Sequence, residues 1–155
     1  MAEKQLMELI DTAIRREEQA FDFYTDILGK IDDDFARETI EEIAKEEKKH
    51  KAFLVKYRDE NWTPKDLKMS DVNFYKIAEY QEEPEISSNM KSEDVYLVAS
   101  HRELRSYKFY TEIAGLHPDG EVKDLLLKMA NEELKHKEKV EYLYANTAFP
   151  QTDGG

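Results

Sequence analysis

The sequence predicts an all-α protein, an antiparallel four-helix bundle of two helical hairpins joined by a long crossover. Gly and Pro are scarce, with 5 and 4 among 155 residues, and 37% of the residues are charged. This composition is typical of long helices. Apolar residues recur at spacings of three and four over four long segments, as on the buried face of a helix. The second half of the chain also repeats the pattern of the first half.

The first predicted hairpin spans residues 4–60. Its first helix covers about 4–29, and Gly29 lies where a C-terminal cap is expected. Its second helix covers about 33–60. Three consecutive acids at its start can cap the helix, and their negative charges interact favourably with the positive end of its dipole: Asp32, Asp33 and Asp34. The turn between the helices is a few residues long, which predicts antiparallel neighbours.

The crossover spans residues 61–91, where prolines and Ser87-Ser88-Asn89 interrupt the helical pattern. A short helix is expected over about 70–80, with Ser70 as its cap. About 30 residues can run back along a helix of ~25 residues, which is ~37 Å long at 1.5 Å per residue. Four aromatic residues are expected to pack the crossover onto the bundle, with a surface for a partner as the alternative: Trp62, Phe74, Tyr75 and Tyr80.

The second predicted hairpin spans residues 92–146, with helices over about 92–116 and 121–146 joined by a short turn. We expect residues 1–150 to form a single domain and residues 147–155 to form a flexible tail. Two hairpins joined by one long crossover are the ferritin-like arrangement of a four-helix bundle.

Composition excludes several classes of protein and site. The chain has no cysteine, which excludes disulfides, Cys-ligated zinc and iron–sulfur clusters within it. Its net charge is −12, from 35 acidic and 23 basic residues, which disfavours nucleic acid and anionic membranes as partners. There is no apolar signal core at the N-terminus and no apolar run of membrane-spanning length. We therefore expect a soluble, cytoplasmic protein.

The repeat carries a pattern of ionisable residues suited to metal binding. In each half, one Glu is followed 30 residues later by Glu-x-x-His, and 86 residues separate equivalent positions. The six residues are Glu17, Glu47, His50, Glu103, Glu133 and His136. Each interrupts an apolar stripe near the middle of a helix, and a Glu and a His three residues apart share a helix face. We expect all six side chains to converge inside the bundle.

Four carboxylates buried without compensation would destabilise the fold strongly. Two divalent ions would neutralise them, and carboxylates with two imidazoles suit Fe(II), Mn(II) or Zn(II). A single Glu-x-x-His is more often a surface ion pair. Two copies, each with an Ala three residues before the Glu, favour a buried two-metal site.

The acids are doubled at Glu46-Glu47 and at Glu132-Glu133, so the repeat alone does not choose between neighbours. Glu46 and Glu132 can instead pair with nearby lysines on the surface.

Tyr24 and Tyr110 each lie seven residues after a Glu of the repeat, on the same stripe. Their hydroxyls would either support the site, by a hydrogen bond or as a radical relay, or be satisfied within an ordinary packed core. His101 is expected on the surface, and His117 belongs to a turn.

The chain resembles the rubrerythrin family of the ferritin-like superfamily over about residues 5–145. The resemblance rests on four motifs: Glu17-x-x-Ala20-x-x-Phe23-Tyr24, Ala44-x-x-Glu47-x-x-His50, Glu103-x-x-Ser106-x-x-Phe109-Tyr110 and Ala130-x-x-Glu133-x-x-His136. It selects Glu47 and Glu133 from the doubled acids. It implies a centre of two iron ions and, in well-known members, reduction of hydrogen peroxide to water. From the ligand chemistry alone, Mn or Zn remains possible in place of iron.

The chain departs from the family pattern in two ways. Typical members carry a Cys-ligated iron domain that delivers electrons, and this chain has no Cys. Electrons would then come from a separate donor protein such as a rubredoxin. Peroxidase-type members also commonly carry an extra glutamate one turn after the first ligand of the second hairpin, where this chain has Ser106.

Three functions follow as hypotheses. The first is a di-iron oxidoreductase that reduces hydrogen peroxide or O2, with the six residues acting as metal ligands and catalytic residues. The second is a ferroxidase or iron-handling protein. The third is a non-catalytic, metal-stabilised helical interaction module. A homodimer is compatible with each of them.

Overall fold

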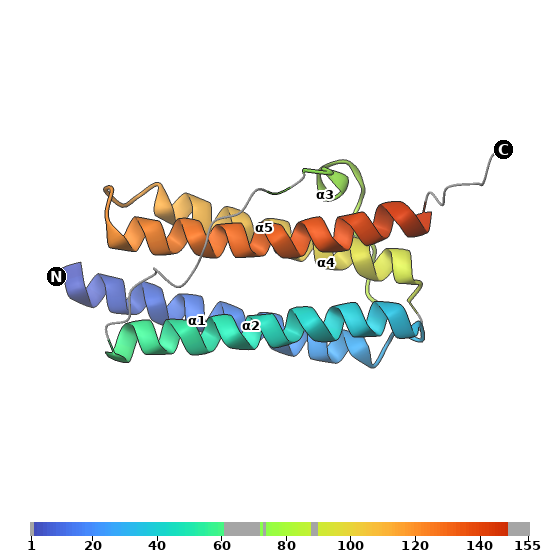
Figure 1. The fold of residues 1–155 in the computed structure, drawn as a ribbon, viewed down its shortest axis with the longest axis horizontal. Helices are drawn as coiled ribbons and strands as arrows, with labels where there is room; N and C mark the ends of the chain where they lie inside the picture. The colour runs from blue at the N-terminus through green and yellow to red at the C-terminus, as the bar shows by residue number, and fades with distance from the viewer. Residues whose placement is uncertain (1, 61–71, 73, 88–89, 149–155) are drawn as a thin grey trace.

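The computed structural model describes residues 2–60, 72, 74–87 and 90–148. Five helices and no strand occur in this part of the chain. They are α1 (Ala2–Leu28), α2 (Asp34–Glu60), α3 (Ile77–Tyr80), α4 (Ser92–Ala114) and α5 (Glu121–Ala148). Figure 1 shows four long helices arranged as two hairpins, α1 with α2 and α4 with α5, while the short α3 lies outside the bundle. The predicted four-helix bundle is confirmed.

The turn between α1 and α2 is held by an arginine rather than by a glycine cap. Gly29 follows α1, but its backbone is not left-handed. The Arg37 guanidinium donates hydrogen bonds to the carbonyl oxygens of Leu28 and, at 3.2 Å, of Ile31. The expectation that Gly29 forms a C-terminal cap is therefore wrong in mechanism, since a cation from α2 satisfies the last carbonyl of α1.

The start of α2 is capped as the acidic run predicts. The Asp33 carboxylate accepts a hydrogen bond of 2.7 Å from the backbone N–H of Ala36, three residues further on. Of the three consecutive acids, Asp33 is the one that caps the helix.

The crossover contains less helix than expected. The backbone of Lys76 is left-handed, with φ of 57°, and α3 after it has only four residues. The expected helix over 70–80 is therefore too long, because an L-residue in this conformation interrupts the helix. Ser70 and Trp62 lie outside the described residues.

The aromatic residues of the crossover do not all pack onto the bundle. Phe74 and Tyr80 are 60% and 79% exposed, so the expectation for these two is wrong. Tyr75 makes a ring contact with Tyr142 of α5, with centroids 6.5 Å apart. The small side chain of Ala78 is buried instead, because polar contacts hold this segment.

The second hairpin follows its prediction closely. α4 ends at Ala114, two residues before the expected end, and α5 continues to Ala148, two residues beyond it. A single backbone bridge links the turn of the first hairpin to the chain entering α4, where the N–H of Met90 donates to the carbonyl oxygen of Lys30 at 3.2 Å.

The buried apolar residues form two clusters, one toward each end of the bundle. One cluster includes Tyr24, Ile40 and Val95, and the other includes Ile10, Leu54 and Leu125. Between them lie the mid-helix positions that carry ionisable residues. The fold therefore places these groups where both ends are closed by apolar packing. None of the described helices is long and apolar enough to cross a membrane.

Candidate metal centre

The structure brings the six residues of the repeat together at the centre of the bundle. All six are buried, with exposed fractions between 1% and 6%: Glu17, Glu47, His50, Glu103, Glu133 and His136. Each of the four long helices supplies at least one of them. Ionisable side chains are rarely buried this fully unless they are paired or bind an ion.

The six residues form two overlapping groups of four, each of which could hold a metal ion. In each group, one ligand atom per residue lies within 4.8 Å of the others. The first group takes Glu17, Glu47 and His50 from the α1–α2 hairpin, and Glu133 from the other hairpin. The second group is the equivalent set with the two hairpins exchanged: Glu103, Glu133 and His136 from the α4–α5 hairpin, and Glu47 from the other.

Glu47 and Glu133 belong to both groups. A carboxylate has two oxygens and can bind two ions, so these two acids would be shared between the ions if both groups were filled. Among the doubled acids, the structure places Glu47 and Glu133 inside, whereas the Glu46 side chain is 47% exposed.

The two histidines turn the same ring atom inward. His136 Nδ1 lies 2.9 Å from Glu47 Oε1 and 3.5 Å from Glu103 Oε1. His50 Nδ1 lies 3.8 Å from both Glu17 Oε2 and Glu133 Oε1. The two rings stack with centroids 5.6 Å apart. Nδ1 is thus the nitrogen that each imidazole presents to the cluster.

The outward nitrogen of each histidine contacts a carboxylate from the opposite hairpin. His136 Nε2 pairs with Glu46, and His50 Nε2 lies 3.5 Å from Glu132 Oε2. A proton held on Nε2 by a carboxylate leaves the Nδ1 lone pair for a metal, as in the carboxylate–histidine–metal arrangement. Glu132 also pairs with Lys135 at 3.2 Å, so the expected lysine contact exists beside the histidine contact.

The two tyrosines of the repeat donate hydrogen bonds across the bundle. The Tyr24 hydroxyl of α1 donates to Glu103 of α4 at 2.5 Å, and the Tyr110 hydroxyl of α4 donates to Glu17 of α1 at 2.8 Å. Each hairpin therefore orients the single carboxylate of the other. Of the roles considered for Tyr24 and Tyr110, support of the site by a hydrogen bond is the one that this geometry shows.

The four carboxylates separate into two kinds. Burial raises the pKa of Glu17, but contacts with Glu47 and His50 lower it to about 2. Burial also raises the pKa of Glu103, but contacts with Glu133 and His136 bring it below its ordinary value. Burial and repulsion from neighbouring carboxylates raise the pKa of both Glu47 and Glu133 well above the usual range. Glu47 and Glu133 therefore bind protons more readily than Glu17 and Glu103.

The imidazoles hold protons in the same way. Burial lowers the pKa of His50, but contacts with Glu132 and Glu17 raise it to about 10. Burial likewise lowers the pKa of His136, but the charge and contact of Glu103 raise it well above its ordinary value. The cluster thus attracts positive charge, which either protons or metal ions can supply.

Five buried polar atoms of this cluster lack a hydrogen-bond partner among the described residues: Glu17 Oε2, Glu47 Oε1, Glu103 Oε2, His50 Nδ1 and His136 Nδ1. The short distance between Glu47 Oε1 and His136 Nδ1 lacks the alignment of a hydrogen bond. Unpaired buried polar atoms are costly. Their convergence and their oxygen–nitrogen chemistry fit a pair of divalent transition-metal ions.

A second buried charged cluster, which the sequence did not reveal, lies close by on α5. Glu141 is fully buried and accepts hydrogen bonds from the Ser100 hydroxyl, the Ala78 backbone N–H at 2.8 Å and the Lys137 ammonium at 3.0 Å. Lys137 also contacts Glu79 at 2.9 Å. This cluster ties α3 to α4 and α5, and every partner is a protein group.

Two further expectations concern residues near the site. His101 is partly buried, and its Nε2 lies 2.8 Å from the carbonyl oxygen of Gln81, so it anchors the crossover rather than standing free on the surface. Ser106 belongs to neither metal-binding group and lines a pocket between α1 and α4 instead.

Comparison with known proteins agrees with this geometry. The family model described as Rubrerythrin matches residues 8–144, which is most of the chain. No curated protein and no solved structure matches the chain. The matched range contains all four long-helix motifs and both metal-binding groups. The chain belongs to the rubrerythrin family.

Proposed function

We propose that this protein is a di-iron oxidoreductase that reduces hydrogen peroxide, or O2, with electrons from a separate donor protein such as a rubredoxin. The observation that carries this proposal is the pair of overlapping groups that share Glu47 and Glu133. When bound, two Fe(II) ions would supply two electrons and open coordination positions for the oxidant. Two electrons and two protons convert one hydrogen peroxide into two water molecules.

The chain's own residues would hold and orient the ions. Glu17 and His50 would bind one ion, Glu103 and His136 the other, and the two shared glutamates both. In this proposal the six ligands are also the catalytic residues, because they touch the reacting centre.

The surrounding residues would keep this geometry rigid. Glu46 and Glu132 keep the histidine rings turned with Nδ1 inward. Burial raises the pKa of both Tyr24 and Tyr110 well above the ordinary value. Both hydroxyls therefore keep their protons and remain hydrogen-bond donors to Glu103 and Glu17 at any physiological pH. Apolar clusters on both sides of the site limit its contact with bulk water.

The test is anaerobic loading with Fe(II) followed by hydrogen peroxide in substoichiometric steps. We expect fast oxidation of about two irons per peroxide, faster than oxidation by O2 at equal concentration. Faster oxidation by O2 would favour a ferroxidase or iron-handling protein instead. A native preparation that carries only zinc, or that binds iron without oxidation, would favour a non-catalytic metal-stabilised module.

A further inference from the structure

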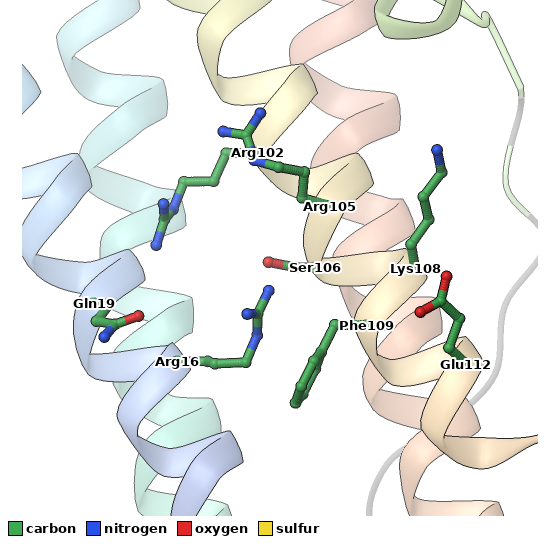
Figure 2. A pocket seen from close by; sticks show the side chains of 8 residues that line it. All are labelled: Arg16, Gln19, Arg102, Arg105, Ser106, Lys108, Phe109 and Glu112. Atoms are coloured by element: carbon green, nitrogen blue, oxygen red, sulfur yellow. The ribbon is translucent and has the colours of Figure 1, made fainter. Parts of the chain in front are cut away.

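A pocket opens between α1 and α4, on the face of the bundle opposite the contact of α2 with α5. Its volume is about 390 Å³, within the range of small-molecule sites. Figure 2 shows the guanidinium groups of Arg16 and Arg102 and the Ser106 hydroxyl pointing into the space between the two helices. The lining residues are Arg16, Gln19, Arg102, Arg105, Ser106, Lys108, Phe109 and Glu112.

The charge of this pocket is opposite to that of the protein. Four of its lining residues are cations and one is an acid, whereas the whole chain has a net charge of −12. A concave surface with one sign of charge concentrates ions of the other sign. The pocket therefore favours anions on a protein that otherwise repels them.

Arg16 and Arg102 are held in place but lack ionic partners among the described residues. The Arg16 guanidinium lies over the Phe109 ring, 4.0 Å from its centroid, and that of Arg102 lies over Phe23 at 4.7 Å. The Nε atom of each is buried without a hydrogen-bond partner, and neither guanidinium pairs with a carboxylate in the described ranges. Arg105 differs, because it binds Glu83 through two hydrogen bonds of 2.9 and 3.2 Å.

An arginine stacked on an aromatic ring has already lost much of its side-chain freedom. Its planar N–H groups can then bind an oxyanion through two parallel hydrogen bonds at little further entropic cost. Two such groups and one hydroxyl, all facing the same space, form a small oxyanion site without any rearrangement of the helices.

The internal repeat separates the cations of the pocket into two kinds. Shifted by 86 residues, Arg105, Ser106 and Lys108 of α4 correspond to three different residues of α1: Gln19, Ala20 and Asp22. Both helices have the same place in their hairpins. Arg105 and Lys108 are thus a property of this pocket and not of the bundle, whereas Arg16 and Arg102 are equivalent positions of the repeat and occur in both hairpins.

We propose that the pocket between α1 and α4 binds a small oxyanion, a phosphate or a carboxylate, between Arg16 and Arg102. Each arginine directly precedes a residue of the metal centre, Glu17 or Glu103. An anion that bridges the two arginines would therefore hold together the two helices that present these carboxylates. The proposal does not depend on peroxide reduction.

Calorimetric titration of the Zn(II)-loaded protein with inorganic phosphate, and separately with acetate, tests this site. Saturable binding of either probe is expected at millimolar concentrations. Arg16→Gln should weaken binding about tenfold or more, because it removes a charged hydrogen-bonding group. Arg15→Gln is the matched control, since Arg15 is the exposed neighbour and contacts only Thr12 at 3.3 Å among the described residues. Its effect should stay below about twofold.

A second variant tests the same site independently, in case Arg16→Gln does not fold correctly. The triple substitution Arg105→Gln, Ser106→Ala and Lys108→Asp copies the α1 residues into α4, so the helix should form normally while anion affinity falls. Arg16→Lys should retain part of the affinity, because it keeps the charge and loses the planar fork. No saturable binding of either probe, or equal effects of Arg16→Gln and Arg15→Gln, would overturn the proposal. If the anion bound only to the zinc ions, Arg16→Gln and Arg15→Gln would have equal effects.

Discussion

Two buried charged clusters lie next to each other on α5, where His136 belongs to one and Lys137 to the other. In the Lys137–Glu141 cluster, the carboxylate has a lysine, a serine and a backbone N–H as partners. In the cluster around Glu47 and Glu133, four acids face two imidazoles, and five polar atoms lack hydrogen-bond partners among the described residues. We call the first cluster complete, because its buried carboxylate has protein partners, and the second incomplete, because five of its polar atoms have no hydrogen-bond partner among the described residues. Both clusters are buried, so burial alone does not indicate a metal site. The unpaired oxygen and nitrogen atoms distinguish the candidate metal centre from the Lys137–Glu141 ion pair.

The largest expected effect is loss of metal from the incomplete cluster. Glu47→Ala removes a residue that belongs to both metal-binding groups, so metal content should fall from about two ions per chain to nearly none. His50→Ala should also lose metal. Elemental analysis after native purification measures this, with Glu42→Ala on the exposed face of α2 as the control. A Glu47→Ala protein that retains two ions would refute the assignment.

Substitutions in the Lys137–Glu141 cluster should lower the stability of the fold rather than its metal content. Lys137→Met leaves Glu141 buried without its cation, which should reduce the free energy of unfolding by about 3–5 kcal/mol while the metal content stays unchanged. Denaturant unfolding of the metal-loaded protein measures the first quantity. The control is Lys139→Met, which breaks an exposed pair with Glu42 and should cost less than about 1 kcal/mol. Equal losses in the two variants would show that the Lys137 pair contributes nothing special.

Protons should compete with metal ions for the ligands around Glu47 and Glu133, so metal affinity should depend on pH. A group with a raised pKa carries its proton at any pH below that value, and the pKa of His50 is raised to about 10. Metal binding must displace these protons, so affinity should fall as pH decreases from about 10. For the single proton displaced from His50, the metal affinity should fall about tenfold per pH unit, and each further proton displaced makes the fall steeper. Proton release on adding Zn(II) in weakly buffered solution measures it, and release of no protons would contradict this account.

The smallest expected effect concerns the outer carboxylates of the histidines. Glu132→Gln removes the charge that holds the Nε2 proton of His50, so metal affinity should fall about 10- to 100-fold with little change in fold. Competition against a chelator of known affinity measures the change, and Glu41→Gln at an exposed position of α2 is the matched control. If both variants bind metal equally well, Glu132 has no role in orienting His50.

The sequence predicted the long helices and the meeting of the six residues because both are encoded by repetition. Apolar spacing defines α1, α2, α4 and α5 to within about two residues, an ordinary uncertainty for helix ends. The 86-residue repeat places Glu17 with Glu103, and His50 with His136, at equal levels of two equivalent hairpins. This convergence required no knowledge of loop structure.

Contacts between distant segments could not be predicted in this way. The Lys137–Glu141 cluster depends on where the crossover returns to the bundle. Lys137 has an equivalent in Lys51, but Glu141 corresponds to Val55 and Ser100 to Ile14, so the repeat does not carry this cluster. The exposure of Phe74 and Tyr80 has the same cause. The repeat did contain one unused signal, because Glu46 and Glu132 are equivalent positions and both turned out to contact a histidine of the other hairpin.

The reciprocal contacts of the metal centre bear on the order in which the molecule is assembled. Each isolated hairpin offers three of the four residues of one metal-binding group. The other hairpin supplies the fourth residue, the carboxylate that contacts the histidine, and the tyrosine that donates to the single glutamate. We therefore expect high-affinity metal binding only after the two hairpins have docked, so that ion uptake would report completed folding.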